Sequence, residues 1–148
     1  MALKVTSVAF EDGGKIPARY TCDGTEVSPP LSFSGVPGGT VELALLCEDP
    51  DAPKGTFVHW VGWGIDPAQP SLAEGEEPPG TGTNGFRKQG YGGPCPPPGP
   101  EHRYMFTAFA LSEALDLPPT ATAGELRDAI EEMVLDAGSL TGRYARPS

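Results

Sequence analysis

Long apolar runs are missing from this chain of 148 residues. A helix that spans a bilayer needs about 18 or more consecutive apolar residues, and no stretch approaches that length. The first residues, MALKVTSVAFEDG, also lack the apolar core and cleavage pattern of a secretory signal peptide. From these absences we expect a soluble, cytoplasmic protein with no membrane insertion.

Basic residues are half as numerous as acidic ones. The sequence has 10 Lys and Arg against 20 Asp and Glu, which gives a formal net charge of −10 at pH 7. Nucleic-acid-binding proteins gain much of their affinity from Lys and Arg contacts to phosphates, so no nucleic-acid partner is expected. The same charge disfavours anionic membrane surfaces.

Cysteines are few and odd in number. The three are Cys22, Cys47 and Cys95, and none of them forms a CxxC pair. This pattern argues against a disulfide framework and against a zinc finger. We therefore expect free thiols that are buried or lie in loops.

Glycine and proline are abundant, with 20 and 18 residues, and they separate short apolar runs. Such spacing is typical of a turn-rich all-β protein. Neither composition nor repeats suggest a second unit, so one domain over residues 1–148 is expected.

Three apolar segments predict central strands, because their runs are nearly continuous or rich in aromatic and β-branched residues. They are residues 41–47, 57–65 and 102–111. Residues 4–10 predict a first strand, residues 31–33 a brief edge strand, and residues 66–83 a surface loop. Period-two alternation places Phe57, His59, Val61 and Trp63 on one face, and His102, Tyr104, Phe106 and Ala108 on another.

One helix is predicted near the end of the chain. Thr122 and Glu125 form a capping-box pattern, and Gly138 is a natural C-cap. Between them, apolar residues recur at helical spacing and form one stripe: Leu126, Ala129, Ile130, Met133, Val134 and Ala137. A short strand over residues 140–144 follows.

Polar residues of catalytic or binding type cluster beside the central strands. Asp49 and Asp51 follow the first of them, His59 lies within the second, and His102 and Tyr104 open the third. Burial of such groups is costly unless they are partnered. Strand ends are places where loops converge into pockets, so these residues are candidates for one site.

Several chemistries are weak fits to this cluster. Carboxylates and imidazoles suit zinc, but no HxH or HExxH spacing fixes the ligands, so we expect no metal. The glycines at 80, 82 and 85 follow no strand and open no helix, so no dinucleotide cofactor is expected. The sequence has no GxSxG elbow. Cys95, which is close in sequence to His102, is the remaining candidate for a catalytic nucleophile.

Anion capture fits better. Backbone N–H groups at Gly92 and Gly93 could point at an oxyanion, and imidazole and phenol groups add donors. Asp49 or Asp51 would then orient His59, or accept a proton from a singly protonated phosphate.

Two segments, DPDAPKGTFVHW and GYGGPCPPPGPEHRYMFTAFAL, closely resemble the phosphatidylethanolamine-binding protein family, in particular its bacterial Raf-kinase-inhibitor-like branch. YTCDGTEVSPPLSFSGVP and the closing LTGRYAR are also similar to that branch, so the likeness spans nearly the whole chain. TNGFRKQGYGG departs from the usual approach to the glycine turn and is expected to alter the rim of the site.

The resemblance implies a mainly β fold, an antiparallel Greek-key β-sandwich with one helix in the C-terminal region, and a small anion site at one end. Carried over by matching motifs, that site consists of Asp49, Asp51, His59, Gly93, Pro94, His102 and Tyr104. It also implies a cis Ala52–Pro53 bond that aims both aspartates into the pocket.

Three functions follow from these observations. The first is a non-enzymatic binding protein that captures phosphate or a phosphorylated head group, such as phosphoethanolamine, and modulates a kinase or protease. The second is a hydrolase that uses Asp/His acid–base chemistry or Cys95. The third is an inhibitory module with a vestigial site, in which the loop 66–83 inserts into a partner enzyme. Apolar edges, with the resemblance, also suggest a homodimer.

Overall fold

The computed structural model describes residues 2–146, which form two antiparallel β-sheets, one α-helix and a short 3-10 helix. The larger sheet has five strands in the order β6-β4-β3-β7-β8, and the smaller has three in the order β1-β2-β5. The large-sheet strands are β3 (Glu42–Asp49), β4 (Phe57–Ile65), β6 (Gly80–Thr81), β7 (His102–Leu111) and β8 (Val134–Tyr144). The others are β1 (Lys4–Thr6), β2 (Leu31–Ser34) and β5 (Ser71–Leu72); η1 (Ala18–Tyr20) is the 3-10 helix.

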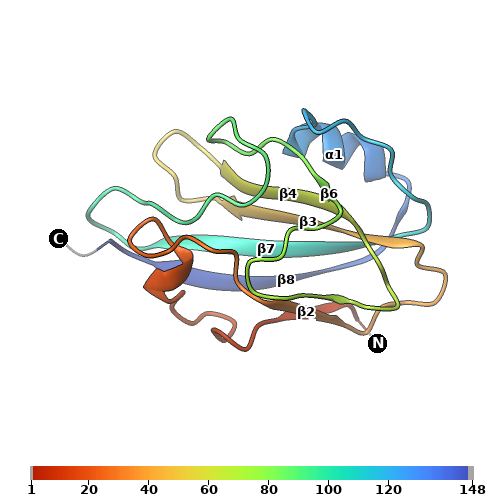
Figure 1. Ribbon diagram of the computed structural model, residues 1–148, viewed down its shortest axis with the longest axis horizontal. Helices are drawn as coiled ribbons and strands as arrows, with labels where there is room; N and C mark the ends of the chain where they lie inside the picture. The colour runs from red at the N-terminus through yellow and green to blue at the C-terminus, as the bar shows by residue number, and fades with distance from the viewer. Residues whose placement is uncertain (1, 147–148) are drawn as a thin grey trace.

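The main core lies between the two sheets. Val5, Leu31 and Phe33 of the smaller sheet belong to the same buried cluster as Leu45 and Phe106 of the larger one. This arrangement confirms the predicted antiparallel β-sandwich. Figure 1 shows the long strands running side by side, with the smaller sheet along one flank.

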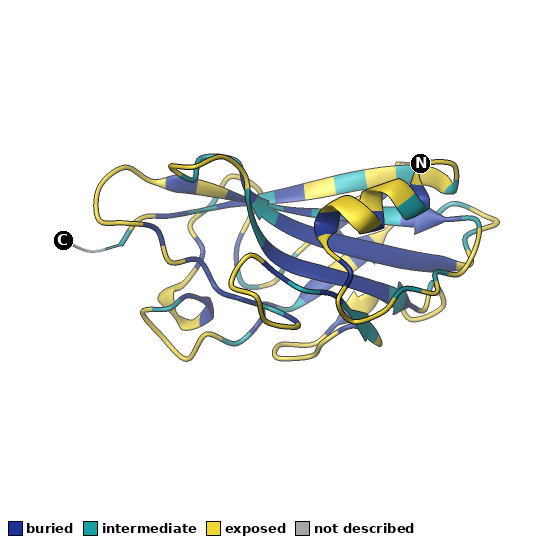
Figure 2. Cartoon of the chain, turned by 90° about the horizontal axis from the view of Figure 1, so that it is seen from above, coloured by how far each residue is buried: buried dark blue, intermediate teal, exposed yellow. Residues whose placement is uncertain are grey.

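The single α-helix, α1 (Ala123–Ile130), covers the other face of the large sheet. Leu126 and Ile130 pack there against Leu46, Val61 and Trp63. β3 is therefore buried on both faces, as its nearly continuous apolar sequence predicted. Figure 2 shows the central strands buried and the outer side of α1 exposed.

The predicted helix is correct at its start and wrong at its end. Thr122 and Glu125 form the expected capping box, but α1 ends at Ile130, and β8 begins at Val134. β8 pairs with β7 from Val134 to Tyr144, so pairing along a full strand outweighs the helical spacing of the last apolar residues. Gly138 is not a C-cap: a Cβ there would lie 2.2 Å from the backbone oxygen of Leu3, so β8 needs a glycine where the chain passes this closely.

Other boundaries also differ from the prediction. The first strand covers only Lys4–Thr6, and β2 lies in the middle of its sheet because the short β5 pairs with its outer side. The segment 66–83 contributes β5 and β6 and is therefore not a loop throughout. No cis peptide bond occurs among residues 2–146, so the predicted cis Ala52–Pro53 bond is wrong.

A β-bulge in β4 turns His59 toward the site. Cys47 pairs with Trp60 and Glu48 pairs with Val58, so His59 is the extra residue opposite this step. Its ring packs against Tyr104 of the main core, whereas Val61 and Trp63 lie beneath α1. The expected single face for these β4 residues is therefore wrong. On β7, where no bulge interrupts residues 102–110, the predicted alternation holds.

Candidate functional site

Strand direction gathers the polar candidates at one end of the large sheet. β4 and β7 both run antiparallel to β3, so their first residues lie beside the last residue of β3. Asp49, His59, His102 and Tyr104 thereby line one cavity of about 150 Å³. Pockets for drug-sized ligands measure roughly 300–1,000 Å³, so this one suits a small group.

Asp49 and His102 form a buried pair at the base of this cavity. Nδ1 of His102 donates to Oδ2 of Asp49 over 2.6 Å, and the two residues are only 7% and 3% exposed. The other oxygen of Asp49 accepts the backbone N–H of Asp51. The aspartate thus orients His102, not His59 as the sequence suggested.

His59 is held by the backbone. Its Nδ1 lies 2.8 Å from the carbonyl oxygen of Gly92, and because a carbonyl only accepts, Nδ1 carries the proton. Burial lowers the pKa of His59 below its ordinary value, against a smaller opposing effect of the bond to Gly92. The ring is therefore neutral at pH 7, and its Nε2 is an acceptor.

Tyr104 carries a buried hydroxyl group with no partner. Its Oη is one of two buried side-chain polar atoms among residues 2–146 that make no hydrogen bond; the other belongs to Ser28. Burial, followed by the charge of Asp49, raises the pKa of Tyr104, so the phenol stays protonated. An unsatisfied buried hydroxyl costs about 1–3 kcal/mol.

Asp51 does not line the cavity. Its carboxylate accepts bonds from Nε, Nη2 and the backbone N–H of Arg103, and these bonds hold the pKa of Asp51 at about 2. The prediction that the carboxylate of Asp51 lies in the pocket does not agree with the structure. Asp51 instead anchors the turn after β3 to the start of β7.

The glycine turn supports the site without presenting donors to it. The N–H of Gly92 donates to the carbonyl of His59, and the N–H of Gly93 donates to Glu26. Pro94 accepts from the N–H of Cys22. The expected oxyanion nest at Gly92 and Gly93 is therefore wrong, because both N–H groups already have partners.

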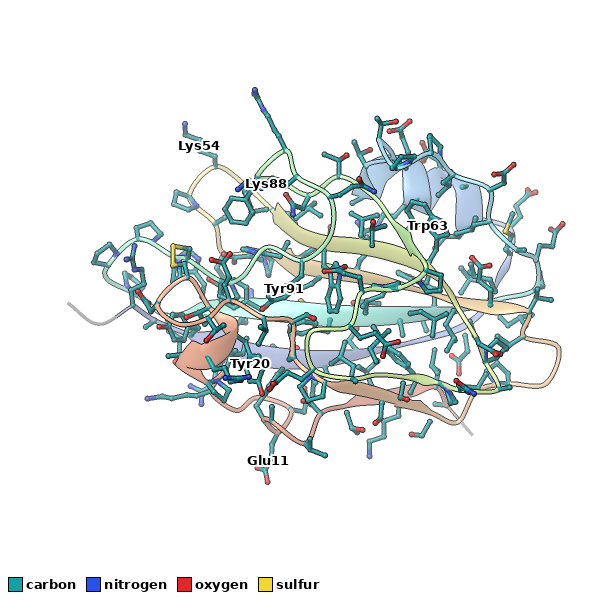
Figure 3. The ribbon with its side chains drawn as sticks, in the orientation of Figure 1. Glu11, Tyr20, Lys54, Trp63, Lys88 and Tyr91 are labelled. Atoms are coloured by element: carbon teal, nitrogen blue, oxygen red, sulfur yellow. A yellow bond between two sulfur atoms is a disulfide. The ribbon has the colours of Figure 1, made fainter. Side chains whose placement is uncertain are left out.

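A disulfide joins Cys22 and Cys95 beside the cavity, across 73 positions of sequence. Figure 3 shows it among the loops at one end of the molecule. The expectation of free thiols is wrong for this pair and correct for the buried Cys47. Because Cys95 is oxidised, it supplies no thiol nucleophile here.

Sequence reasoning did not identify the apolar wall of the cavity. Phe57 and Phe86 pack edge to face with centroids 4.8 Å apart, and both rings contact His59. Pro53, Pro96 and Pro97 complete this wall. Phe86 is 41% exposed and lies in a turn in which Asn84 accepts its N–H. The signal available in the sequence was an aromatic residue within a polar loop.

No group of three or more potential metal-ligating side chains occurs among the residues that the structure describes. Nor does any helix in that part of the chain have the length and apolarity needed to cross a membrane.

The chain is a β-sandwich with a small pocket at the end of its larger sheet, and sequence comparison names the family. Residues 6–145 match the family model for phosphatidylethanolamine-binding protein. The chain belongs to the phosphatidylethanolamine-binding protein family.

Two relatives show how far the likeness extends. A UPF0098 protein of Methanothermobacter thermautotrophicus is 48% identical over 145 residues, which cover 93% of this chain and 95% of the relative. The crystal structure of CT736 from Chlamydia trachomatis, described as a putative phosphatidylethanolamine-binding protein homologue, superposes with a TM-score of 0.94 at 38% identity and covers 99% of both chains. Sequence and fold therefore agree over nearly the whole chain.

A third relative corrects the expected location. The Mycobacterium tuberculosis protein named "Putative lipoprotein LppC" is 43% identical over 145 residues, which cover 96% of this chain and 72% of the relative. That name points to membrane association, so the cytoplasmic expectation is contradicted.

Proposed function

We propose that this chain is a binding protein for a small phosphate-bearing group, held in the cavity of Asp49, His59, His102 and Tyr104. The observation that carries the proposal is the buried, unpartnered hydroxyl of Tyr104, which needs an acceptor. A phosphate oxygen is a strong acceptor and would satisfy this donor.

The hydrogen-bonding groups favour a phosphate that carries a proton. Nε2 of neutral His59 accepts, so its partner must donate. A phosphate monoester with one P–OH supplies both a donor for His59 and an acceptor for Tyr104. A diester has no P–OH and leaves His59 without a partner.

The carboxylate of Asp49 is compatible with this anion. Both of its oxygens already accept hydrogen bonds, one from His102 and one from the backbone of Asp51. The negative charge of Asp49 still repels an anion in the cavity. This repulsion favours the monoanion of a phosphate monoester over the dianion.

The hydrolase alternative has less support from the lining of the cavity. The lining includes no Ser or Thr, and its one cysteine, Cys95, is in a disulfide. Asp49 and His102 could orient a water molecule, but no serine, threonine or free cysteine lies beside them in this lining. Modulation of a kinase or protease, insertion of an inhibitory loop and a homodimer stay predictions.

Calorimetry with inorganic phosphate and phosphoethanolamine tests the proposal. We expect saturable binding that the Tyr104→Phe variant weakens by at least tenfold, because a hydrogen bond to a charged group contributes about 1.5–3 kcal/mol. Tyr91→Phe is the matched control, since its hydroxyl bonds to the backbone of Tyr20 outside the cavity. Absence of binding by the unmodified protein, or equal binding by Tyr104→Phe, contradicts the proposal.

A further inference from the structure

One side of the cavity is formed by a loop that is rich in proline. Cys95, Pro96 and Pro97 line the cavity, and they belong to the sequence CPPPGP over residues 95–100, which we call the proline loop. Figure 1 shows it just before β7, projecting past the strands at the end of the molecule where the C-terminus lies. Each proline fixes φ at about −65°, so the loop is stiff.

Backbone hydrogen bonds do not hold the proline loop in place. Proline has no N–H, so Cys95 and Gly99 carry the only backbone donors of the loop. Among residues 2–146, neither donor and no carbonyl of residues 95–100 takes part in a backbone–backbone hydrogen bond. The loop is therefore fixed at its two ends and by whatever its side chains bind.

The disulfide ties the proline loop to a well-anchored support. Cys22, its partner in the disulfide, donates its N–H to the carbonyl of Pro94, which directly precedes the loop. The next residue, Asp23, accepts the hydroxyl of Tyr144 on β8. The Cys22–Cys95 bond thus connects the loop to a segment that is itself bonded to the large sheet.

The opposite side of the cavity does not depend on this link. His59 and Tyr104 are buried residues of β4 and β7, and Phe57 begins β4. Pairing of both strands with β3 holds these side chains in position. The proline loop and its disulfide therefore set the width of the cavity, whose volume is about 150 Å³.

We propose that the Cys22–Cys95 disulfide limits the size of the ligand, and that its reduction by a dithiol opens the cavity to larger phosphate monoesters. In the oxidised protein the proline loop lies against the cavity and leaves space for a small group. Without the disulfide, residues 95–100 can move away as a semi-rigid unit. The inference rests on the proposed function, because it concerns the ligand of the same cavity.

The disulfide is accessible to such a reductant. Cys95 is exposed and Cys22 is half-buried. A thiolate of the dithiol attacks one sulfur, forms a mixed disulfide and releases the other sulfur as a thiolate. The second thiol of the reductant then attacks the mixed disulfide and releases the second cysteine. Two electrons and two protons pass to Cys22 and Cys95, and the dithiol becomes a disulfide.

A disulfide that only stabilises the fold gives a different pattern. Its loss would change the affinity for small and large ligands by the same factor, or change neither. A limit on ligand size instead alters the ratio of the two affinities. This ratio is therefore the quantity that distinguishes the two roles.

Calorimetry with inorganic phosphate and phenyl phosphate measures this ratio. The oxidised protein is compared with protein reduced by dithiothreitol, at a temperature at which both are folded. We expect phenyl phosphate to bind the oxidised protein at least about tenfold more weakly than inorganic phosphate. Reduction should strengthen phenyl phosphate binding by at least about tenfold, because its ring gains space, and change inorganic phosphate binding by less than about threefold.

Two variants separate the size limit from lost stability. Cys22→Ser/Cys95→Ser should match the reduced protein, and dithiothreitol should not change it further. Ile130→Ala removes most of a buried side chain beneath α1, on the other face of the large sheet. It should lower the melting temperature but leave the ratio of the two affinities as in the oxidised protein.

Nuclear magnetic resonance relaxation of the ligand-free protein reports on the loop itself. The amides of Cys95 and Gly99 should have order parameters of about 0.85 in the oxidised protein and below about 0.6 after reduction. The amide of Val61 in β4 is the control and should stay at about 0.85 in both states.

An unchanged ratio of affinities after reduction, or order parameters of Cys95 and Gly99 that do not fall, would overturn the inference. Phosphate binding with an unchanged ratio would overturn the size limit and support the proposed function. Absence of binding of both compounds in both states would contradict the proposed function, and the order parameters would then decide alone whether the disulfide fixes this side of the cavity.

Discussion

Asp49 and His102 are 53 positions apart in sequence, yet their side chains meet over 2.6 Å in a nearly dry environment. Asp49 ends β3 and His102 begins β7, and these strands are antiparallel neighbours. The pair is therefore a product of sheet topology, and it fixes the orientation of one imidazole in the cavity.

Replacement of Asp49 should destabilise the protein strongly. Breaking a buried pair costs about 3–5 kcal/mol, and we expect Asp49→Ala to lower the free energy of unfolding by about this amount in urea denaturation. Asp51→Ala is the matched control, because its pair with the half-exposed Arg103 is worth at most about 1 kcal/mol. If both variants lose the same free energy of unfolding, the buried Asp49–His102 pair contributes no more to stability than the exposed Asp51–Arg103 pair.

Tyr104→Phe should leave the ligand-free protein as stable as before, or more stable by up to about 2 kcal/mol, because the variant removes an unsatisfied buried hydroxyl. Urea denaturation without phosphate measures this difference. A loss of stability would instead show that Oη has a partner in the ligand-free protein, such as an ordered water molecule.

Affinity for a phosphate monoester should rise as pH falls. The second ionisation of a phosphate monoester lies near pH 6, so its P–OH form is about 20-fold more abundant at about pH 5.5 than at about pH 7.5. Because neutral His59 requires a donor, phosphoethanolamine should bind more tightly by about that factor in calorimetry.

Dimethyl phosphate is the control for this pH dependence. It has no P–OH, so it should bind weakly and with little dependence on pH. A diester that binds as well as the monoester and also tightens on acidification would assign the titrating proton to a histidine of the protein.

Protein stability should fall on acidification through His59. Its pKa is lowered in the folded state, so between that value and about 6.5 the unfolded chain binds a proton that the folded protein does not. Stability is then complete above about pH 6.5 and declines below it by up to about 1.4 kcal/mol per pH unit, levelling off below the lowered pKa.

Urea denaturation at about pH 7.5 and pH 5.5 measures this decline. The charges of Asp49 and Glu26 act against the lowering but do not overcome burial. In His59→Gln the decline should be smaller than in the unmodified protein. An equal decline would assign the acid sensitivity to other groups.

The disulfide should be a major stabilising link. It closes a loop across 73 positions, for which chain-entropy models predict about 4 kcal/mol. Cys22→Ser/Cys95→Ser should therefore lower the melting temperature by about 10 °C, and a reductant should lower that of the unmodified protein similarly. The double variant should not respond to the reductant, because the buried Cys47 has no partner thiol.

Local sequence was informative where one pattern had a single structural solution. β4 and β7 have the predicted bounds, and the capping box of Thr122 marks the start of α1. The pattern was ambiguous at β8, where residues 134–137 satisfy a helical stripe and a strand equally well. Pairing with β7 decided between them.

The sequence by itself determined which polar groups were too costly to bury without a purpose, and four of them, Asp49, His59, His102 and Tyr104, surround the cavity. Only the tertiary structure decided their partners. The β-bulge in β4 orients His59 toward Tyr104, and the strand order of the large sheet brings His102 beside Asp49. The path of the loops brings Cys22 to Cys95. Burial cost is a property of each residue, whereas partners depend on chain crossings and strand register that no short stretch of sequence encodes.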